Sequence, residues 1–167
     1  LDKKTLTILR WIAIIGQFFA INFVYFYLKL KFPIFICTAI ILVGFTTNIY
    51  LQFKIKGNQI KDFYASLFLI YDLLQLSLLL YFTGGISNPF SILLIVPAIV
   101  SSTFLSMGTT FILGAISMSF LFLLTNFHYP LPGLHEYGIT FPKFYLVGFF
   151  IAILIGLIFL SYFGIRF

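Results

Sequence analysis

The chain is a succession of long apolar runs separated by short polar stretches. A run of about 20 apolar residues can cross the roughly 30 Å of hydrocarbon in a membrane as a helix. Short connections favour antiparallel neighbours. The sequence therefore predicts an all-α polytopic membrane protein, a single domain of six transmembrane helices in an antiparallel bundle. The predicted spans are residues 6–28, 34–53, 63–83, 90–106, 109–127 and 143–165.

A short polar turn, residues 83–90, lies between the third and fourth spans. Gly84 and Gly85 leave the backbone free to adopt positive φ and to let another molecule approach closely. Pro89 cannot continue the preceding helix but can begin the next one. Asn88 is the one amide side chain of the turn. We expect a rigid hairpin that presents backbone N–H groups and this amide beside an aromatic cluster, which comprises Tyr81, Phe82 and Phe90.

Composition and charge support a membrane location. The chain is 62% hydrophobic and 8% charged, whereas about 25% is charged in a typical soluble domain. Its cations lie almost wholly outside the apolar runs, so they indicate topology and not nucleic-acid binding. Cytoplasmic loops are rich in Lys and Arg, which predicts cytoplasmic termini and an outward-facing turn, periplasmic in a bacterium. The cytoplasmic group is Lys3, Lys4, Arg10, Lys54, Lys56, Lys61 and Arg166, and the outer group is Lys29, Lys31 and Lys143.

Asp72 is the one carboxyl group deep in an apolar run, and Gln75 follows on the same helical face. A carboxylate at the membrane centre costs at least about 2.5 kcal/mol unless it is neutral or partnered, so Asp72 is expected to face the bundle interior. The two residues are either interhelical hydrogen-bonding groups or a proton-responsive, conformation-sensing position. Asp72 lies roughly 18 Å along the helix from Gly84, too far to touch a ligand at the turn. The candidate partners are Gln17, Asn22 and Asn48.

Two spans carry signals of helix packing. In the sixth, Gly148, Ala152 and Gly156 recur every four residues, and a row of small residues lets another helix approach closely. The sequence leaves open whether that helix belongs to the same bundle or to a second copy in a homodimer. In the fourth span, Pro97 is expected to kink or loosen the helix about two turns beyond the hairpin. This kink makes the fourth span a candidate moving part.

Motifs for catalysis are absent from the sequence, which contains no HExxH, paired-cysteine, phosphate-loop or nucleophile-elbow pattern. His128 and His135 lie in one predicted external loop and not on two facing spans, which argues against a bis-histidine haem site. Interfacial or pH-sensing roles remain open for both. The single cysteine, Cys37, excludes an internal disulfide and a thiolate metal cluster. We expect no metal, haem or flavin, so binding and signal transmission remain.

Three motifs follow one another along the middle of the chain. Residues 72–75 read DLLQ, residues 84–90 read GGISNPF, and residues 96–102 read VPAIVSS. In this order, between the third and fourth of six spans, they resemble the membrane sensor module of RegB/PrrB-type redox-responsive histidine kinases, whose signature is GGxxNPF. The PLP segment at 130–132 extends the resemblance over nearly the whole chain.

The resemblance implies a sensor of the quinone pool in the bacterial inner membrane, surrounded by lipid and dimeric in the full-length kinase. Bound ubiquinone would bias a cytoplasmic kinase towards its inactive state and so control phosphotransfer to a response regulator. Donors at the turn would bind a quinone carbonyl, aromatic rings would pack on the ring, and apolar helices would hold the isoprenoid tail. Asp72, Gln75 and Pro97 would transmit the signal. The quinone-binding candidates are Gly84, Gly85, Ser87, Asn88, Pro89, Phe90 and Tyr81.

The family's phospho-accepting histidine, ATP-binding domain and redox-active cysteine would follow the sixth span. They are not among these 167 residues, so we expect no kinase activity from the chain alone and regard the sixth span as the output element. A small transporter built around Asp72 is the alternative, although no internal repeat relates the two halves. A quinone-using membrane enzyme would need a cofactor site.

Overall fold

The computed structural model describes residues 1–130 and 142–163, and these are helical apart from short connections. An isolated β-bridge joins Asp2 and Gln59, and no strand occurs in the described ranges. The predicted all-α class is therefore confirmed. The helices are α1 (Lys3–Asn22), extended by the π-helix η1 (Phe23–Tyr27), α2 (Ile34–Lys54), α3 (Asp62–Phe82), the 3₁₀ segments η2 (Gly85–Ser87) and η3 (Pro89–Ile95), α4 (Val96–Phe104), α5 (Met107–Asn126) and α6 (Lys143–Phe163).

Four helices are long and apolar enough to cross a membrane: α1 together with η1, α2, α3 and α5. Two further apolar helical stretches are shorter in the part of the chain that is described, Pro89–Phe104 and Tyr145–Ile158. Each of the six predicted apolar runs is thus helical over nearly all of its described residues, and the exceptions lie at the ends of the runs. Length and composition establish candidate spans for four of them.

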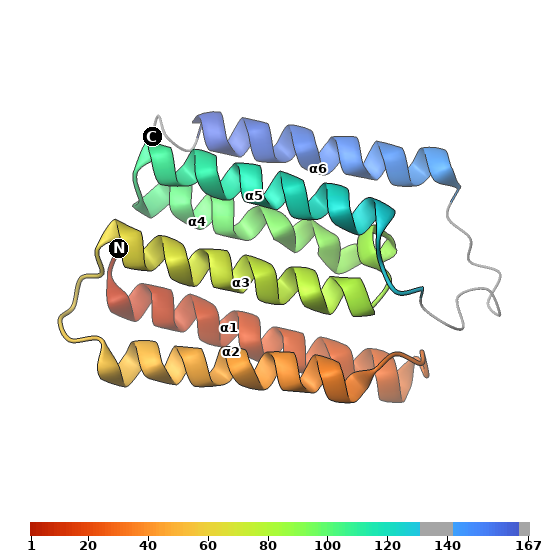
Figure 1. Cartoon of the computed structure of the whole chain (residues 1–167), viewed down its shortest axis with the longest axis horizontal. Coiled ribbons are helices and arrows are strands. Elements are labelled where there is room, and N and C mark those ends of the chain that lie inside the picture. Colours follow the sequence, from red (N-terminus) through yellow and green to blue (C-terminus); the bar gives the residue numbers. More distant parts are fainter. Residues whose placement is uncertain (131–141, 164–167) are drawn as a thin grey trace.

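The helices lie side by side as a bundle in which α3 is central (Figure 1). On one side α1 packs closely on α2, and on the other side α4, α5 and α6 pack on one another. The two sides differ in their interiors. The core between α3 and α6 includes Leu73, Leu94, Leu121 and Leu157, and the polar side chains buried on this side are hydroxyls, those of Ser91, Ser101, Thr110 and Ser117. The layer between α1, α2 and α3 instead buries the guanidinium of Arg10 and the amides of Asn48 and Gln75.

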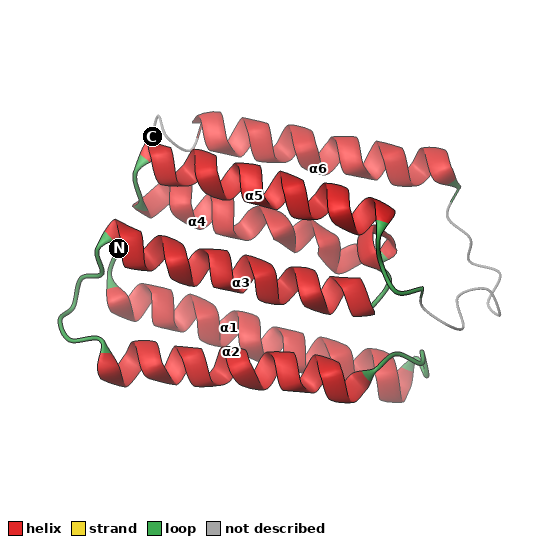
Figure 2. Ribbon diagram, in the orientation of Figure 1, coloured by secondary structure: helices red, strands yellow, loops and turns green. Residues whose placement is uncertain are grey.

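The connections between the helices lie at the two ends of the bundle (Figure 2). Hydrogen bonds hold them in place. At the end where α1 begins, the Lys3 N–H donates to the Asn58 carbonyl at 2.8 Å, and the Ser106 N–H donates to the Asp62 carboxylate at 3.2 Å. At the opposite end, the Tyr129 N–H beyond α5 donates to the Tyr81 carbonyl at 2.8 Å. This second end carries the turn that follows α3.

The fourth apolar run, predicted as one helix kinked or loosened at Pro97, consists of two kinds of helix. Its first part is the 3₁₀ segment η3, and α4 begins only at Val96 with Pro97 in its first turn. Proline fits the first turn of a helix because the N–H that it lacks has no partner there in any case. Pro97 therefore marks the change from 3₁₀ to α-helix and does not interrupt a continuous α-helix.

Candidate functional site

The turn after α3 is held by the side chain of Asn88. Its Nδ2 donates to the Thr83 carbonyl at 3.1 Å and to the Thr83 hydroxyl at 2.8 Å. Its Oδ1 accepts from the Phe90 N–H at 2.9 Å and so caps η3. Both amide hydrogens are used inside the turn, since an amide NH₂ supplies two. Asn88 is therefore a positioning residue, and the sequence could not distinguish this role from ligand binding.

Three further backbone donors, at Ser87, Asn88 and Ser91, are also used by the turn itself. The Ser87 N–H donates to the Gly84 carbonyl and the Asn88 N–H to the Gly85 carbonyl, both at 3.2 Å. The Ser91 N–H donates to the Asn88 carbonyl at 2.9 Å. The predicted hairpin is thus present, and internal hydrogen bonds occupy these donors.

The two glycines adopt the positive φ that their sequence predicts, 100° at Gly84 and 59° at Gly85. The close approach at Gly85 comes from the same chain. A Cβ built on Gly85 would lie 2.5 Å from Cγ of His128 and 2.7 Å from the Leu124 carbonyl oxygen. The turn therefore packs against the last turn of α5, and His128 takes part in this contact. His135 lies outside the described residues.

The side chains that the turn leaves exposed are aromatic. Tyr81 is 39% exposed and Phe90 is 44% exposed, and Pro89 beside Phe90 is exposed as well. Tyr81 packs edge-on against Phe82, with ring centroids 5.1 Å apart. Gly84, Gly85 and the neighbouring Ile86 are buried. A ligand would therefore meet an aromatic surface in front of a buried, hydrogen-bonded turn.

Replacing Asn88 with alanine is expected to lower the free energy of unfolding by about 1–2 kcal/mol, because the cap of η3 and both bonds to Thr83 are lost. Asn88→Asp keeps the accepting oxygen for the Phe90 N–H but sets a second oxygen against the Thr83 carbonyl, so it should not restore the stability. Chemical unfolding in detergent micelles measures both changes. Asn126→Ala is the control, since this exposed amide donates only to the Phe122 carbonyl of its own helix, at 2.8 Å. Equal losses at the two positions would refute the role given to Asn88.

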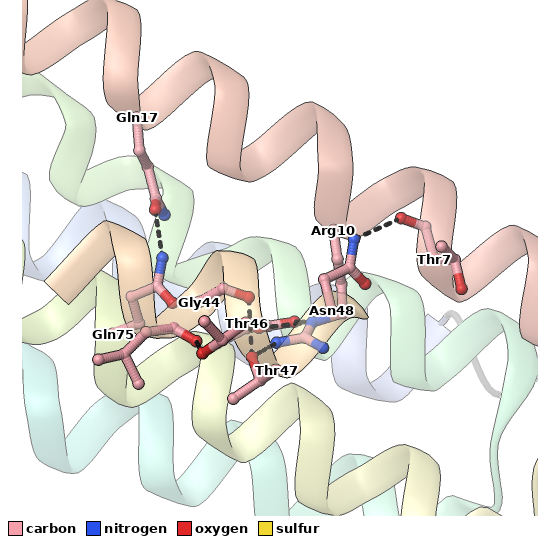
Figure 3. Close-up of polar contacts among 10 residues, drawn as sticks. Thr7, Arg10, Gln17, Gly44, Thr46, Thr47, Asn48 and Gln75 are labelled. Atoms are coloured by element: carbon pink, nitrogen blue, oxygen red, sulfur yellow. Dashed lines mark hydrogen bonds and ion pairs between the residues drawn. The ribbon is translucent and has the colours of Figure 1, made fainter. Parts of the chain in front are cut away.

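A second polar site lies in the middle of the bundle, centred on Arg10 (Figure 3). The Arg10 Nε donates to both carboxylate oxygens of Asp72, at 2.9 and 3.0 Å. Its Nη2 donates to the Thr47 hydroxyl at 2.8 Å. The guanidinium also lies over the rings of Phe68 and Tyr71, 4.9 and 5.6 Å from their centroids. The Arg10 side chain is only 2% exposed, and that of Asp72 is 25% exposed.

Gln75 makes the second link between α1 and α3. Its Nε2 donates to the Gln17 Oε1 at 2.6 Å (Figure 3). Gly44 of α2 lies against the Gln75 amide so closely that a Cβ at this position would overlap it. In the same layer, the Asn48 Nδ2 donates to the Thr7 carbonyl at 3.3 Å. Long polar side chains therefore bridge α1 to α3, and a glycine in α2 makes room for one of them.

The sequence correctly placed Asp72 and Gln75 in the bundle interior and named Gln17 as a candidate partner, but it missed Arg10. The charge pattern predicts that Arg10 belongs to the cytoplasmic group of cations, whereas the structure buries it as the partner of Asp72. Asn22, another candidate, donates to the Phe18 carbonyl of its own helix. The sequence does contain a signal for the pairing of Arg10 with Asp72, because the first and third apolar runs each carry one charged residue.

The small residues of α6 do not share one environment. A Cβ on Gly156 would lie 2.9 Å from Cδ1 of Ile95, so this glycine packs inside the bundle. Gly148 has no neighbour within 4 Å of such a Cβ, and Ala152 is exposed. The bundle thus accounts for Gly156, and no described part of the chain covers the face of Gly148 and Ala152.

Two further features concern ligands. A groove of about 480 Å³ opens between α5 and α6, with Phe122, Leu123, Phe150 and Leu154 in its walls. Among the described residues, no group of three His, Cys, Asp or Glu side chains is arranged to hold a metal ion. Cys37 is buried in α2 as a free thiol.

Comparison with known proteins finds relatives for nearly the whole chain. The sequence is 36% identical over 164 residues, 98% of its length, to the sensor histidine kinase RegB of Cereibacter sphaeroides. A second RegB from a strain of that species is 36% identical over 75 residues, 44% of this chain. These matches cover 36% and 16% of the relatives' lengths, so the chain spans about a third of the first. No protein-family model and no solved structure matches the chain.

Proposed function

Because this chain belongs to the RegB/PrrB family of sensor histidine kinases, as a transmembrane sensor module, we propose that it is the redox-sensing part of a two-component system. The observation that carries the proposal is the match to RegB over 98% of the chain. It includes the GGISNPF turn, whose first three residues are buried and which is internally bonded and edged by exposed aromatic rings. The kinase activity and its response regulator would belong to the longer protein.

We propose that the bundle crosses the bacterial inner membrane six times in alternate directions, with both termini in the cytoplasm. The two shorter apolar helical stretches, Pro89–Phe104 and Tyr145–Ile158, would then be the fourth and sixth spans. The excess of Lys and Arg at the end where α1 begins supports this orientation. It would place the turn after α3 at the outer, periplasmic surface.

The proposed ligand is ubiquinone, with its headgroup against the aromatic edge of the turn. Phe90 and Tyr81 would pack on the ring, and the Tyr81 hydroxyl would donate to a quinone carbonyl. Gly84, Gly85, Ser87, Asn88 and Pro89 would shape the site, because the Asn88 amide and the backbone N–H groups of Ser87 and Asn88 already donate within the turn. Reduction turns the accepting carbonyl into a donating hydroxyl, so the two redox forms would bind with different affinity.

A difference in affinity between two conformations is what allows a ligand to shift their equilibrium. The turn follows directly on α3, and α3 carries Asp72 and Gln75, which bind α1. The turn also lies against the end of α5, and η3 packs on α6. We therefore assign transmission to Asp72, Gln75 and Pro97, with α6 as the output element.

The remaining partners follow from uncovered surfaces. The groove between α5 and α6 is apolar and would hold part of the isoprenoid tail, because α5 also contacts the turn. The face of Gly148 and Ala152 would meet a second copy in a homodimer.

Transport is the weaker alternative, since Asp72 is bound by Arg10 and does not offer a free carboxylate.

Phe90→Ala is expected to weaken ubiquinone binding by about tenfold, the loss of one ring contact worth roughly 1.4 kcal/mol. Binding is measured by titrating a ubiquinone analogue into purified chain and following quenching of protein fluorescence. The matched control is Phe63→Ala, because Phe63 is 67% exposed at the opposite end of α3 and packs edge-on against Tyr64 as Tyr81 does against Phe82. Unchanged affinity in Phe90→Ala, or an equal loss in both variants, would refute the site.

A further inference from the structure

A second groove lies at the end of the bundle opposite the turn. It has a volume of about 430 Å³ and is formed by the start of α1, the end of α2 and the loop that follows α2. The first residues of the chain are fixed beside this loop, because the Lys3 N–H donates to the Asn58 carbonyl at 2.8 Å and the Ile60 N–H donates to the Leu1 carbonyl at 3.0 Å. The walls of the groove are therefore held in place by hydrogen bonds.

One end of this groove is positively charged. The Lys3 ammonium is fixed there, since it donates to the carbonyls of Gln52 and Ile55 at 3.1 and 2.8 Å. Lys4 is exposed. The single acid of the groove, Asp2, is already occupied as the cap of α1, where it accepts from the Thr5 N–H at 3.2 Å and from the Thr5 hydroxyl at 3.3 Å. With two ammonium groups and one carboxylate, this end of the groove carries a net positive charge, which attracts an anion.

The groove becomes apolar along α1. Ile8, which is 47% exposed, and Trp11 follow the lysines on its wall. Trp11 is fixed by an edge-on contact with Phe45, with ring centroids 5.1 Å apart. Lys3 and Trp11 are eight positions apart on the helix, roughly 12 Å. A ligand that fills the groove thus needs an anionic end and an apolar chain that runs on from it.

We propose that this groove binds one anionic glycerophospholipid. Its phosphate lies between Lys3 and Lys4, the amide of Asn58 donates to the headgroup, and one acyl chain lies along Ile8 and Trp11. Basic side chains beside a membrane attract anionic lipids, and here the apolar wall adds a site for the chain. A free phosphate would use the lysines but leave that wall unoccupied. The proposal is independent of quinone binding at the opposite end.

Trp11 is the one tryptophan in the sequence, so its fluorescence reports on this groove directly. Purified chain in detergent is titrated with phosphatidylglycerol that carries brominated acyl chains, which quench tryptophan on contact. We expect saturable quenching at a concentration at least fivefold lower than with brominated phosphatidylcholine. Equal quenching by the two lipids would overturn the proposal, as would full competition by inorganic phosphate at millimolar concentration.

Lys4→Gln is expected to raise the half-saturating concentration of brominated phosphatidylglycerol at least fivefold. The matched control is Lys56→Gln, because Lys56 is an exposed cation at the same end of the bundle but does not line the groove. Its effect should stay within twofold. Equal effects would mean a diffuse attraction of the whole basic surface and would overturn the site. Both residues are exposed, and the quenching by a neutral brominated detergent checks that Trp11 remains accessible in each variant.

Discussion

Arg10→Met is expected to lower the free energy of unfolding by about 3–5 kcal/mol. The substitution leaves Asp72 in the bundle interior without the guanidinium that binds both of its oxygens, and removing one partner of a buried ion pair costs this much. It also removes the bond to Thr47 and the contact with the Phe68 ring. Unfolding of the purified chain in mixed micelles, followed by circular dichroism, measures the loss.

The double variant Arg10→Met with Asp72→Leu separates the ion pair from general packing. Apolar residues of similar size often replace a buried ion pair with little loss, so the double variant should be more stable than Arg10→Met alone. Lys61→Met is the control for loss of a cation, because Lys61 is exposed before α3. Additive losses in the double variant, or a loss below 1 kcal/mol in Arg10→Met, would show that Arg10 and Asp72 are not coupled.

The Arg10 site also explains what sequence reasoning could and could not reach. The sequence placed Asp72 in the interior because an unpartnered carboxylate in an apolar layer is costly. It did not find the partner, because Arg10 stands near the beginning of an apolar run and looks like a cation that flanks a span. In the bundle Arg10 lies roughly 10 Å along α1 and Asp72 roughly 15 Å along α3 from the same end, so the two meet. Whether two residues of neighbouring helices lie at the same depth in the bundle depends on how the helices pack, and neither segment shows this alone.

In the turn too, the local sequence predicts the backbone shape, whereas contacts with residues elsewhere in the chain are not predicted. Positive φ at Gly84 and Gly85 follows from local sequence, and the structure confirms it. The two glycines predict the close approach of another molecule. In the structure, the group that lies close to Gly85 is His128 of the same chain. The donors of Asn88 looked free because Thr83, their acceptor, carries no distinctive pattern. Local chemistry therefore predicted the shape of the turn but not which of its groups remain available to a ligand.

Gly85→Ala is expected to lower the free energy of unfolding by about 2–5 kcal/mol. An L-residue in the left-handed region costs about 1–2 kcal/mol, and overpacking a filled site costs about 1–3 kcal/mol more. The new methyl would lie 2.6 Å from Cβ of His128 and 2.7 Å from the Leu124 carbonyl oxygen. Because one of these neighbours is backbone, the turn must move away from α5, and quinone binding beside Phe90 should weaken together with stability.

Two glycines elsewhere separate the terms of this loss. Gly57 has a φ of 95° and nothing within 4 Å of a built Cβ, so Gly57→Ala isolates the conformational cost and should lose about 1–2 kcal/mol. Gly16 lies in α1 with similar open space, and Gly16→Ala should be neutral or stabilising by up to about 1 kcal/mol.

Adding His128→Gly to Gly85→Ala removes the side-chain overlap but keeps the carbonyl of Leu124, so it should restore only part of the stability. A loss in Gly85→Ala no greater than that in Gly57→Ala would mean that the turn is not packed against α5, and the path from the aromatic edge to the rest of the bundle would then have to run through α3 alone.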